Sequence, residues 1–244
     1  MLPRPHLKIC CIASVAEATL ALAAGADAIG LVSAMPSGPG VIDDDTIAAI
    51  VAAVPRSLRT FLLTSRTSAP AIADQVRAAG ANTVQVVDAL PQDAYARLRD
   101  ALPAVHLVQV LHVRGEETLR EAEVVAPLVD ALLLDSGNPG LAVKELGGTG
   151  RVHDWSVSRR IVEASPVPVW LAGGLRAENV RAAIEAVRPF GVDVCSGVRV
   201  DGRLDAARLT AFAQAVAAGA GPCPPRDALG SPPGGARAAA AGAH

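Results

Sequence analysis

Aromatic side chains are almost missing from this sequence, since tryptophan, tyrosine and phenylalanine together make up 2% of its 244 residues. Lysine is equally scarce and occurs only as Lys8 and Lys144, and the formal net charge is -2 at pH 7. A core with so few aromatics must be aliphatic. A chain without clustered cations also lacks the basic face that nucleic-acid binding needs. We therefore expect no nucleic-acid partner.

Long apolar runs and metal-type cysteine spacings are also lacking. No stretch approaches the roughly 18 apolar residues that would span a bilayer, and residues 1–14 do not read as a signal peptide. The four cysteines, at positions 10, 11, 195 and 223, form no zinc-type cluster. Neighbouring strand residues point to opposite faces, so Cys10 and Cys11 are not expected to bond to each other. These absences predict a reduced cytoplasmic protein with no membrane partner and no zinc site.

The end of the chain differs in composition from the rest. Residues 218–244 are dense in proline, glycine and alanine, and such a segment cannot bury enough apolar surface to offset its ordering entropy. We expect one domain over residues 1–217 and a disordered tail over 218–244.

Within residues 7–217, short apolar runs alternate with amphipathic, alanine-rich stretches. The expected strands are residues 7–12, 27–32, 58–63, 83–87, 105–113, 130–134, 168–172 and 192–196. The expected helices lie near 15–24, 43–53, 68–79, 91–100, 116–126, 155–163, 177–187 and 205–217. Nearly continuous apolar strands indicate burial on both faces, as in a parallel sheet covered by helices.

Eight strand–helix units in about 210 residues fit an α/β fold of the (β/α)8 TIM-barrel type, whose usual size is about 250 residues. A doubly wound sheet is the alternative. That fold usually has fewer strands and a glycine-rich phosphate loop after the first strand, whereas "CIAS" follows the first strand here. The pattern favours the barrel.

Chemistry in such barrels lies at the carboxyl ends of the strands, and phosphate often binds after the last two. "LAGGL" offers Gly173 and Gly174 after the seventh strand, and "CSGV" offers Ser196 and Gly197 after the eighth. Exposed backbone N–H groups and a following helix N-terminus bind anions there. Tight turns alone would explain any one such loop. Together with "GGTG" (147–150), they predict a phosphate site.

Three further side chains stand at or near strand ends. Cys10 is either a small core residue or a nucleophile or general base, which would need a depressed thiol pKa. Lys8 lies on the same strand face, and its cation could favour a thiolate or bind an anionic intermediate. Asp135 ends an apolar strand, either as a turn residue or as a proton donor whose pKa is raised by its surroundings. The first and sixth strands face each other across a barrel, which suits acid–base isomerisation.

Several motifs, in one order, resemble the phosphoribosylanthranilate isomerase family of tryptophan biosynthesis. They are "LKICCIAS", "LLLDS", "GGTGRVHDWS", "VWLAGGLRAENV", "VRPFGVDVCSGV" and "DAARLTAFAQAV", which together cover about residues 7–217. The resemblance implies a TIM barrel that performs an Amadori rearrangement without metal or cofactor. It implies Cys10 as the general base at C2' and Asp135 as the general acid that opens the ribose ring.

The resemblance also implies a small phosphorylated substrate. Its phosphate would meet Gly148, Thr149 and the glycine and serine residues of the two later loops. Members of the family are monomers or homodimers, and we expect one of these states.

Three positions depart from the family's pattern. The family carries a Pro-Arg pair after the second strand, whose guanidinium pairs with the substrate's carboxylate, whereas Gly40 follows Pro39 here. The Q-L-H-G of the fourth strand reads "QVVD", so only Gln85 is retained as a substrate-binding candidate. Arg199 replaces the usual glutamate after S-G-V, and Cys11 takes the place of the glycine in K-I-C-G.

Arg199, Arg66 and Arg114 are candidates for the missing carboxylate partner, although each is expected to be a solvated surface arginine. Two alternatives to the isomerase follow from these departures. One is a paralogue that isomerises another phosphoribosylamine or sugar phosphate. The other is a non-catalytic barrel that binds a phosphorylated ligand, which would require neither Cys10 nor Asp135.

Overall fold

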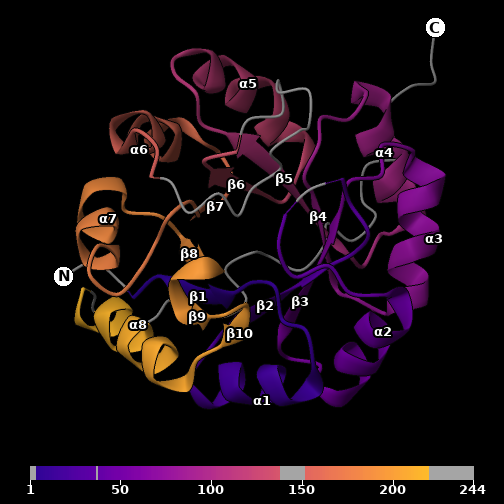
Figure 1. The fold of residues 1–244 in the computed structure, drawn as a ribbon. Helices are drawn as coiled ribbons and strands as arrows, with labels where there is room; N and C mark the ends of the chain where they lie inside the picture. The colour runs from indigo at the N-terminus through magenta and orange to yellow at the C-terminus, as the bar shows by residue number, and fades with distance from the viewer. Residues whose placement is uncertain (1–3, 37, 138–151, 220–244) are drawn as a thin grey trace, which may run out of the picture.

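The computed structural model describes residues 4–36, 38–137 and 152–219, and it contains a closed barrel of eight parallel strands (Figure 1). Each strand pairs with the next in sequence order, and the last pairs with the first. The strands are β1 (His6–Ile9), β2 (Ala28–Val32), β3 (Arg59–Thr64), β4 (Thr83–Val86), β5 (His106–His112), β6 (Ala131–Asp135), β7 (Val169–Leu171) and β8 (Gly191–Val194).

The helices form a ring around this barrel (Figure 1). They are α1 (Val15–Ala23), α2 (Asp44–Ala53), α3 (Ala69–Ala79), α4 (Gln92–Ala101), α5 (Glu117–Val125), α6 (Trp155–Ala164), α7 (Val180–Val187) and α8 (Ala206–Ala218). The predicted TIM barrel is confirmed. In the part of the chain that the structure describes, no helix is long and apolar enough to cross a membrane. The predicted tail from residue 220 onward lies outside the described residues.

Local sequence accounts for where the helices begin and end. Ser14 caps α1 by accepting a hydrogen bond from the backbone N–H of Glu17, and Asp43 caps α2 in the same way. Gly80 ends α3 in the left-handed conformation, at φ +68°, which glycine adopts without strain. The first two caps fix where α1 and α2 begin, and Gly80 fixes where α3 stops and the chain turns toward the next strand.

Burial on both faces explains why the strands are so apolar. One cluster of buried, mainly aliphatic residues lies between the strands and the surrounding helices. A second fills the inside of the barrel and includes Phe61, Trp170 and Cys10. Because every residue of β6 is buried, the carboxylate of Asp135 at its end is held by a rigid strand.

A short hairpin after β8 is the main element that the apolar pattern did not predict. A 3-10 turn, η2 (Ser196–Val198), leads into β9 (Arg199–Val200), which pairs antiparallel with β10 (Arg203–Leu204). The hairpin brings Arg199 to the end of β1, where its side chain donates hydrogen bonds to the carbonyls of Cys10 and Cys11.

The cysteines also differ from expectation. Cys11 has φ +62°, so the strand alternation ends there and Cys11 packs with Cys10 among the residues inside the barrel. Its sulfur is bonded to that of Cys195 just after β8, with the two Cα atoms 5.9 Å apart. The expectation of a fully reduced protein is therefore wrong for these two residues. Cys10 remains a free thiol, and no bond joins Cys10 to Cys11.

Candidate active site

The Cys10 thiol lies inside the mouth of the barrel, directly after β1. Its backbone N–H donates to the carbonyl of Val194 in β8, and the residue is 5% exposed. A β-carbon added at Gly30 of β2 would lie 2.7 Å from the Cys10 sulfur. A glycine at that position therefore makes the space that the thiol occupies.

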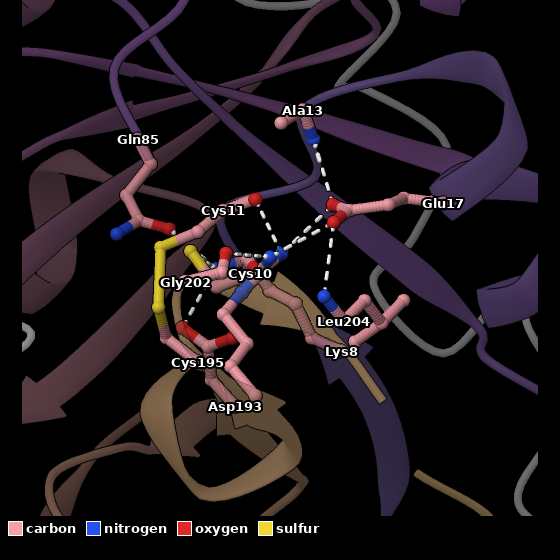
Figure 2. The surroundings of a disulfide bond; sticks show 11 residues. Lys8, Cys10, Cys11, Ala13, Glu17, Gln85, Asp193, Cys195, Gly202 and Leu204 are labelled. Atoms are coloured by element: carbon pink, nitrogen blue, oxygen red, sulfur yellow. Dashed lines mark hydrogen bonds and ion pairs between the residues drawn. A yellow bond between two sulfur atoms is a disulfide. The ribbon is translucent and has the colours of Figure 1, made fainter. Parts of the chain in front are cut away.

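Lys8 joins the thiol to two other buried polar groups. Its Nζ donates to Asp193 Oδ2 at 2.7 Å, to Gln85 Oε1 at 3.0 Å and to the Cys10 sulfur at 3.8 Å (Figure 2). The Lys8 ammonium also lies 4.9 Å from the centre of the Phe61 ring. The structure thus brings together three of the predicted site residues, on β1 and β4, with Asp193 of β8.

Electrostatics around this cluster favour a charged lysine beside a neutral thiol. Burial lowers the pKa of Lys8, but the charge of Asp193, and that of Cys10 when it is ionised, outweigh burial, and the pKa ends above its ordinary value. Burial likewise raises the pKa of the Cys10 thiol to about 11, against the opposing effect of Lys8. The depressed thiol pKa that sequence reasoning required is therefore absent, because burial outweighs the neighbouring cation.

Asp135 lies at the end of β6, three strands from β1 through β7 and β8. It is 8% exposed, and its Oδ1 accepts a hydrogen bond from the backbone N–H of Ser136 at 2.7 Å. When Asp135 is ionised, its charge acts on Lys8 and on Cys10, where it raises the thiol pKa. The predicted acid and the predicted base thus open into the same barrel mouth.

His153 reaches the same region from the loop before α6. Its Nε2 lies 2.7 Å from Ser158 Oγ, and its Nδ1 would lie 3.1 Å from a β-carbon added at Gly173. Burial lowers the pKa of His153 despite the opposing charge of Asp135. A neutral imidazole therefore lies near Asp135 and beside Gly173, in the predicted phosphate loop after β7.

The loops after β7 and β8 approach each other closely. Gly173 and Gly174 have φ +87° and +61°, and a β-carbon at Gly197 would lie 2.1 Å from the carbonyl oxygen of Leu175. A cavity of about 460 Å³ opens at these loops, lined by Gly174, Arg176, Glu178, Ser196, Gly197 and Arg208 among others. Three of the four described residues predicted for phosphate therefore share one cavity. Gly148 and Thr149 lie outside the described residues.

The loop that carries Gly40 packs against the disulfide. Gly40 has φ +76°, and a β-carbon there would lie 2.5 Å from the Cβ of Cys11. Ile42 donates to the carbonyl of Val32, which holds this loop against the end of β2. The space beside residue 40 is thus filled by Cys11, the residue that departs from the family's glycine.

Of the three arginines considered for the missing clamp, Arg199 differs most from expectation. Its side chain is 7% exposed rather than solvated, because it pairs with Glu17 of α1 at 3.0 Å. Arg66 is 44% exposed and lies 4.0 Å from Asp44, and Arg114 is exposed. The prediction of a surface arginine is wrong for Arg199, since the β9–β10 hairpin folds it inward.

Comparisons with known proteins identify the family of this chain. Residues 7–215 match the family described as "PRAI: N-(5'phosphoribosyl)anthranilate (PRA) isomerase". The chain belongs to this family. It is 35% identical to N-(5'-phosphoribosyl)anthranilate isomerase of Methanosarcina acetivorans, over 87% of this chain and 93% of that one. The Haloferax volcanii isomerase is 37% identical, over 88% and 95%.

Solved structures of the isomerase family share the fold. The phosphoribosylanthranilate isomerase of Thermotoga maritima superposes with a TM-score of 0.76 at 26% identity, covering 88% of this chain and 99% of that one. A phosphoribosylanthranilate isomerase in complex with reduced 1-(o-carboxyphenylamino)-1-deoxyribulose 5-phosphate gives 0.74 at 25% identity, with the same coverage. The motif-based resemblance is therefore confirmed.

Asp193 and His153 are site residues that sequence reasoning did not single out. Asp193 carried a visible signal, since it is the one charged residue within the apolar stretch "VDVCS". His153 carried none, because a histidine in a loop has no pattern of its own. Barrel closure, and not sequence spacing, brings both to the site.

Proposed function

We propose that this protein is an isomerase that converts N-(5'-phosphoribosyl)anthranilate into 1-(o-carboxyphenylamino)-1-deoxyribulose 5-phosphate, a step of tryptophan biosynthesis. The observation that carries the proposal is the placement of a buried thiol and a buried carboxyl, Cys10 and Asp135, at one barrel mouth. A glycine-lined cavity lies at the adjacent loops. Membership in the isomerase family supports the same reaction.

In the proposed mechanism, Asp135 donates a proton to the ring oxygen of the ribose, and the C1'–O bond breaks to give an open-chain iminium. Cys10 as thiolate then removes the proton from C2', and the electron pair of that C–H bond forms the enolamine. Protonation at C1' and loss of the hydroxyl proton at C2' give the ketose. The reaction is an internal redox exchange and requires no outside oxidant or reductant.

Lys8 supports the base in this scheme. Its Nζ is fully buried and already bonded to Asp193, Gln85 and Cys10. These contacts favour stabilisation of the thiolate over direct binding of an anionic intermediate. Gln85 orients the ammonium, and its contact with the substrate stays a prediction.

The substrate's phosphate would bind to the backbone N–H groups of the loops after β7 and β8, with Gly148 and Thr149 of the preceding loop. Arg176 and Arg208 line the same cavity and add positive charge at its rim. A cytoplasmic location and a monomeric or homodimeric state remain predictions of the sequence.

The test is turnover of N-(5'-phosphoribosyl)anthranilate, followed by loss of its fluorescence as pH is varied. A base works unprotonated, and the pKa of Cys10 is raised to about 11. Because the mechanism needs Asp135 protonated and Cys10 ionised, we expect the residual kcat/KM of Asp135→Asn, which lacks the titrating acid, to rise by roughly tenfold per pH unit from pH 7 to 9. Cys10→Ser and Asp135→Asn should each lose about 100-fold or more of the activity.

Cys223→Ser is the matched control for thiol removal and should keep wild-type rates. Lys8→Met removes the cation that opposes burial, so it should lower the ionised fraction of Cys10 and with it kcat/KM at pH 7. A flat profile between pH 7 and 9 in Asp135→Asn, or full activity in Cys10→Ser, would overturn the assignment of the base. A binder without catalysis would turn over no substrate in any variant.

A further inference from the structure

A buried arginine donates hydrogen bonds to the two residues that directly follow β1. Arg199 Nη2 donates to the carbonyl of Cys10 at 3.3 Å and also to the carbonyl of Cys11. Its two Nη atoms each donate to a different oxygen of Glu17 at 3.0 Å. One guanidinium therefore joins the end of β1 to helix α1.

Glu17 is itself held in place from two further segments. Its carboxylate accepts hydrogen bonds from the backbone N–H groups of Ala13 and Leu204, each at 3.0 Å (Figure 2). Arg199 Nη1 also donates to the carbonyl of Gly202 at 2.9 Å. The ion pair is thus fixed between α1 and the β9–β10 hairpin, both of which lie outside the strand ladder.

The end of β1 requires such an anchor because its backbone leaves the regular ladder there. Cys11 has φ +62°, a conformation that costs a residue other than glycine about 1–2 kcal/mol. Buried carbonyls at this turn also need donors from outside the sheet. The planar fork of an arginine can serve two carbonyls and a carboxylate at once, which a lysine cannot do.

We propose that Arg199 is a positioning residue of the isomerase reaction, which fixes the Cys10 and Cys11 carbonyls and thereby aims the Cys10 sulfur into the barrel mouth. This inference rests on the proposed role of Cys10 as base. The charges that act on the thiol come from Lys8, Asp193 and Asp135. Arg199 therefore works through the backbone of Cys10 and not through its proton affinity.

The test compares Arg199→Met and Arg199→Lys with Arg203→Met, a control at an exposed arginine of the same hairpin. All variants are assayed at temperatures where circular dichroism shows them folded. Misplacement of a catalytic group by about 1 Å can cost roughly 100-fold in rate. We expect kcat to fall by about 100-fold in Arg199→Met with KM within about twofold, and the variant to keep the wild-type dependence of kcat on pH.

Arg199→Lys retains the charge beside Glu17 and loses the fork, so it should recover only part of kcat. Control Arg203→Met should match the wild type. Wild-type kcat in folded Arg199→Met would overturn the proposal. So would full recovery of kcat in Arg199→Lys, because the ion pair alone would then suffice.

A second measurement does not depend on turnover. The rate of Cys10 alkylation by iodoacetamide is read by mass spectrometry, with Cys223 in the same chain as internal reference. A loosened strand end should raise the Cys10 rate by about tenfold in Arg199→Met. An unchanged ratio of the two rates would overturn the positioning role. If the wild type fails to convert the substrate, the proposed function fails, while this ratio still decides the role of Arg199.

Discussion

At the scale of single residues, positions 11 and 40 are two of the points at which this site departs from the pattern of its family. Cys11 stands where the resemblance places a glycine, and it keeps the positive φ that favours glycine. Gly40 stands where the resemblance places the carboxylate-binding arginine, and its Cα faces the Cβ of Cys11. The two departures are therefore coupled, because a side chain at position 40 and one at position 11 compete for the same space.

This coupling predicts a non-additive pair of substitutions. Gly40→Arg alone should lower the free energy of unfolding by about 1–3 kcal/mol, because its Cβ would lie 2.5 Å from that of Cys11. It should not lower KM for N-(5'-phosphoribosyl)anthranilate. Adding Cys11→Gly, with Cys195→Ser to avoid a free partner thiol, removes the obstructing side chain. KM in that triple variant should then fall by about tenfold, since a hydrogen bond to a charged group contributes roughly 1.5–3 kcal/mol.

Urea unfolding and steady-state kinetics on the single and combined variants give the coupling energy directly. The Cys11→Gly/Cys195→Ser background without Gly40→Arg is the control. A lower KM in Gly40→Arg alone, without loss of stability, would contradict the steric argument.

At the scale of elements, the apolar pattern predicts every strand and helix of the barrel to within a few residues of its observed bounds. The reason is that each strand is buried on both faces and each helix on one, so burial imposes a regular pattern of apolar residues on the sequence. The β9–β10 hairpin escapes prediction because strands of two residues carry no periodicity. The sequence predicts Arg199 as a surface residue for the same reason, since only the fold of the hairpin turns its side chain toward Glu17.

The contact between α1 and this hairpin predicts an acid-sensitive share of stability. Burial raises the pKa of Glu17, but hydrogen bonds from Arg199, Leu204 and Ala13 outweigh it, so the pKa lies below 4.5. A depressed carboxyl pKa gives stability that is present above the unfolded pKa and is lost as pH falls through the folded one. Glu17→Gln should therefore destabilise the protein at pH 7 by about 1–3 kcal/mol, and the difference should shrink as pH falls below 4.5.

Urea denaturation of wild type and Glu17→Gln at pH 7 and in steps down to pH 3 measures this difference. Glu185→Gln is the matched control, because Glu185 forms an exposed pair with Arg181 on α7, worth at most about 0.5 kcal/mol. A penalty for Glu17→Gln that stays constant with pH would mean that the carboxylate charge contributes nothing.

At the scale of the whole molecule, barrel closure decides which residues meet. The sequence could indicate that Cys10, Asp135 and the glycine loops share one end of the barrel, because all follow parallel strands. It could not indicate that Lys8 would meet Asp193, since 185 residues separate them and only the pairing of β1 with β8 brings them together. The burial that sets the pKa of Cys10 is likewise a property of the closed barrel and not of the local motif.

The Cys11–Cys195 disulfide joins the ends of β1 and β8, the two strands whose pairing closes the barrel. It predicts that the stability of the protein depends on its redox state. Cys11 and Cys195 are 184 residues apart in sequence, and a crosslink that closes so long a loop restricts the unfolded chain strongly. Reduction, or Cys195→Ser, should lower the free energy of unfolding by about 2–4 kcal/mol. Cys223→Ser should leave it unchanged.

Alkylation of the unreduced, denatured protein should label Cys10 and spare Cys11 and Cys195. Labelling of Cys11 and Cys195 before reduction, or equal stability of the oxidised and reduced forms, would show that strand pairing alone holds β1 against β8.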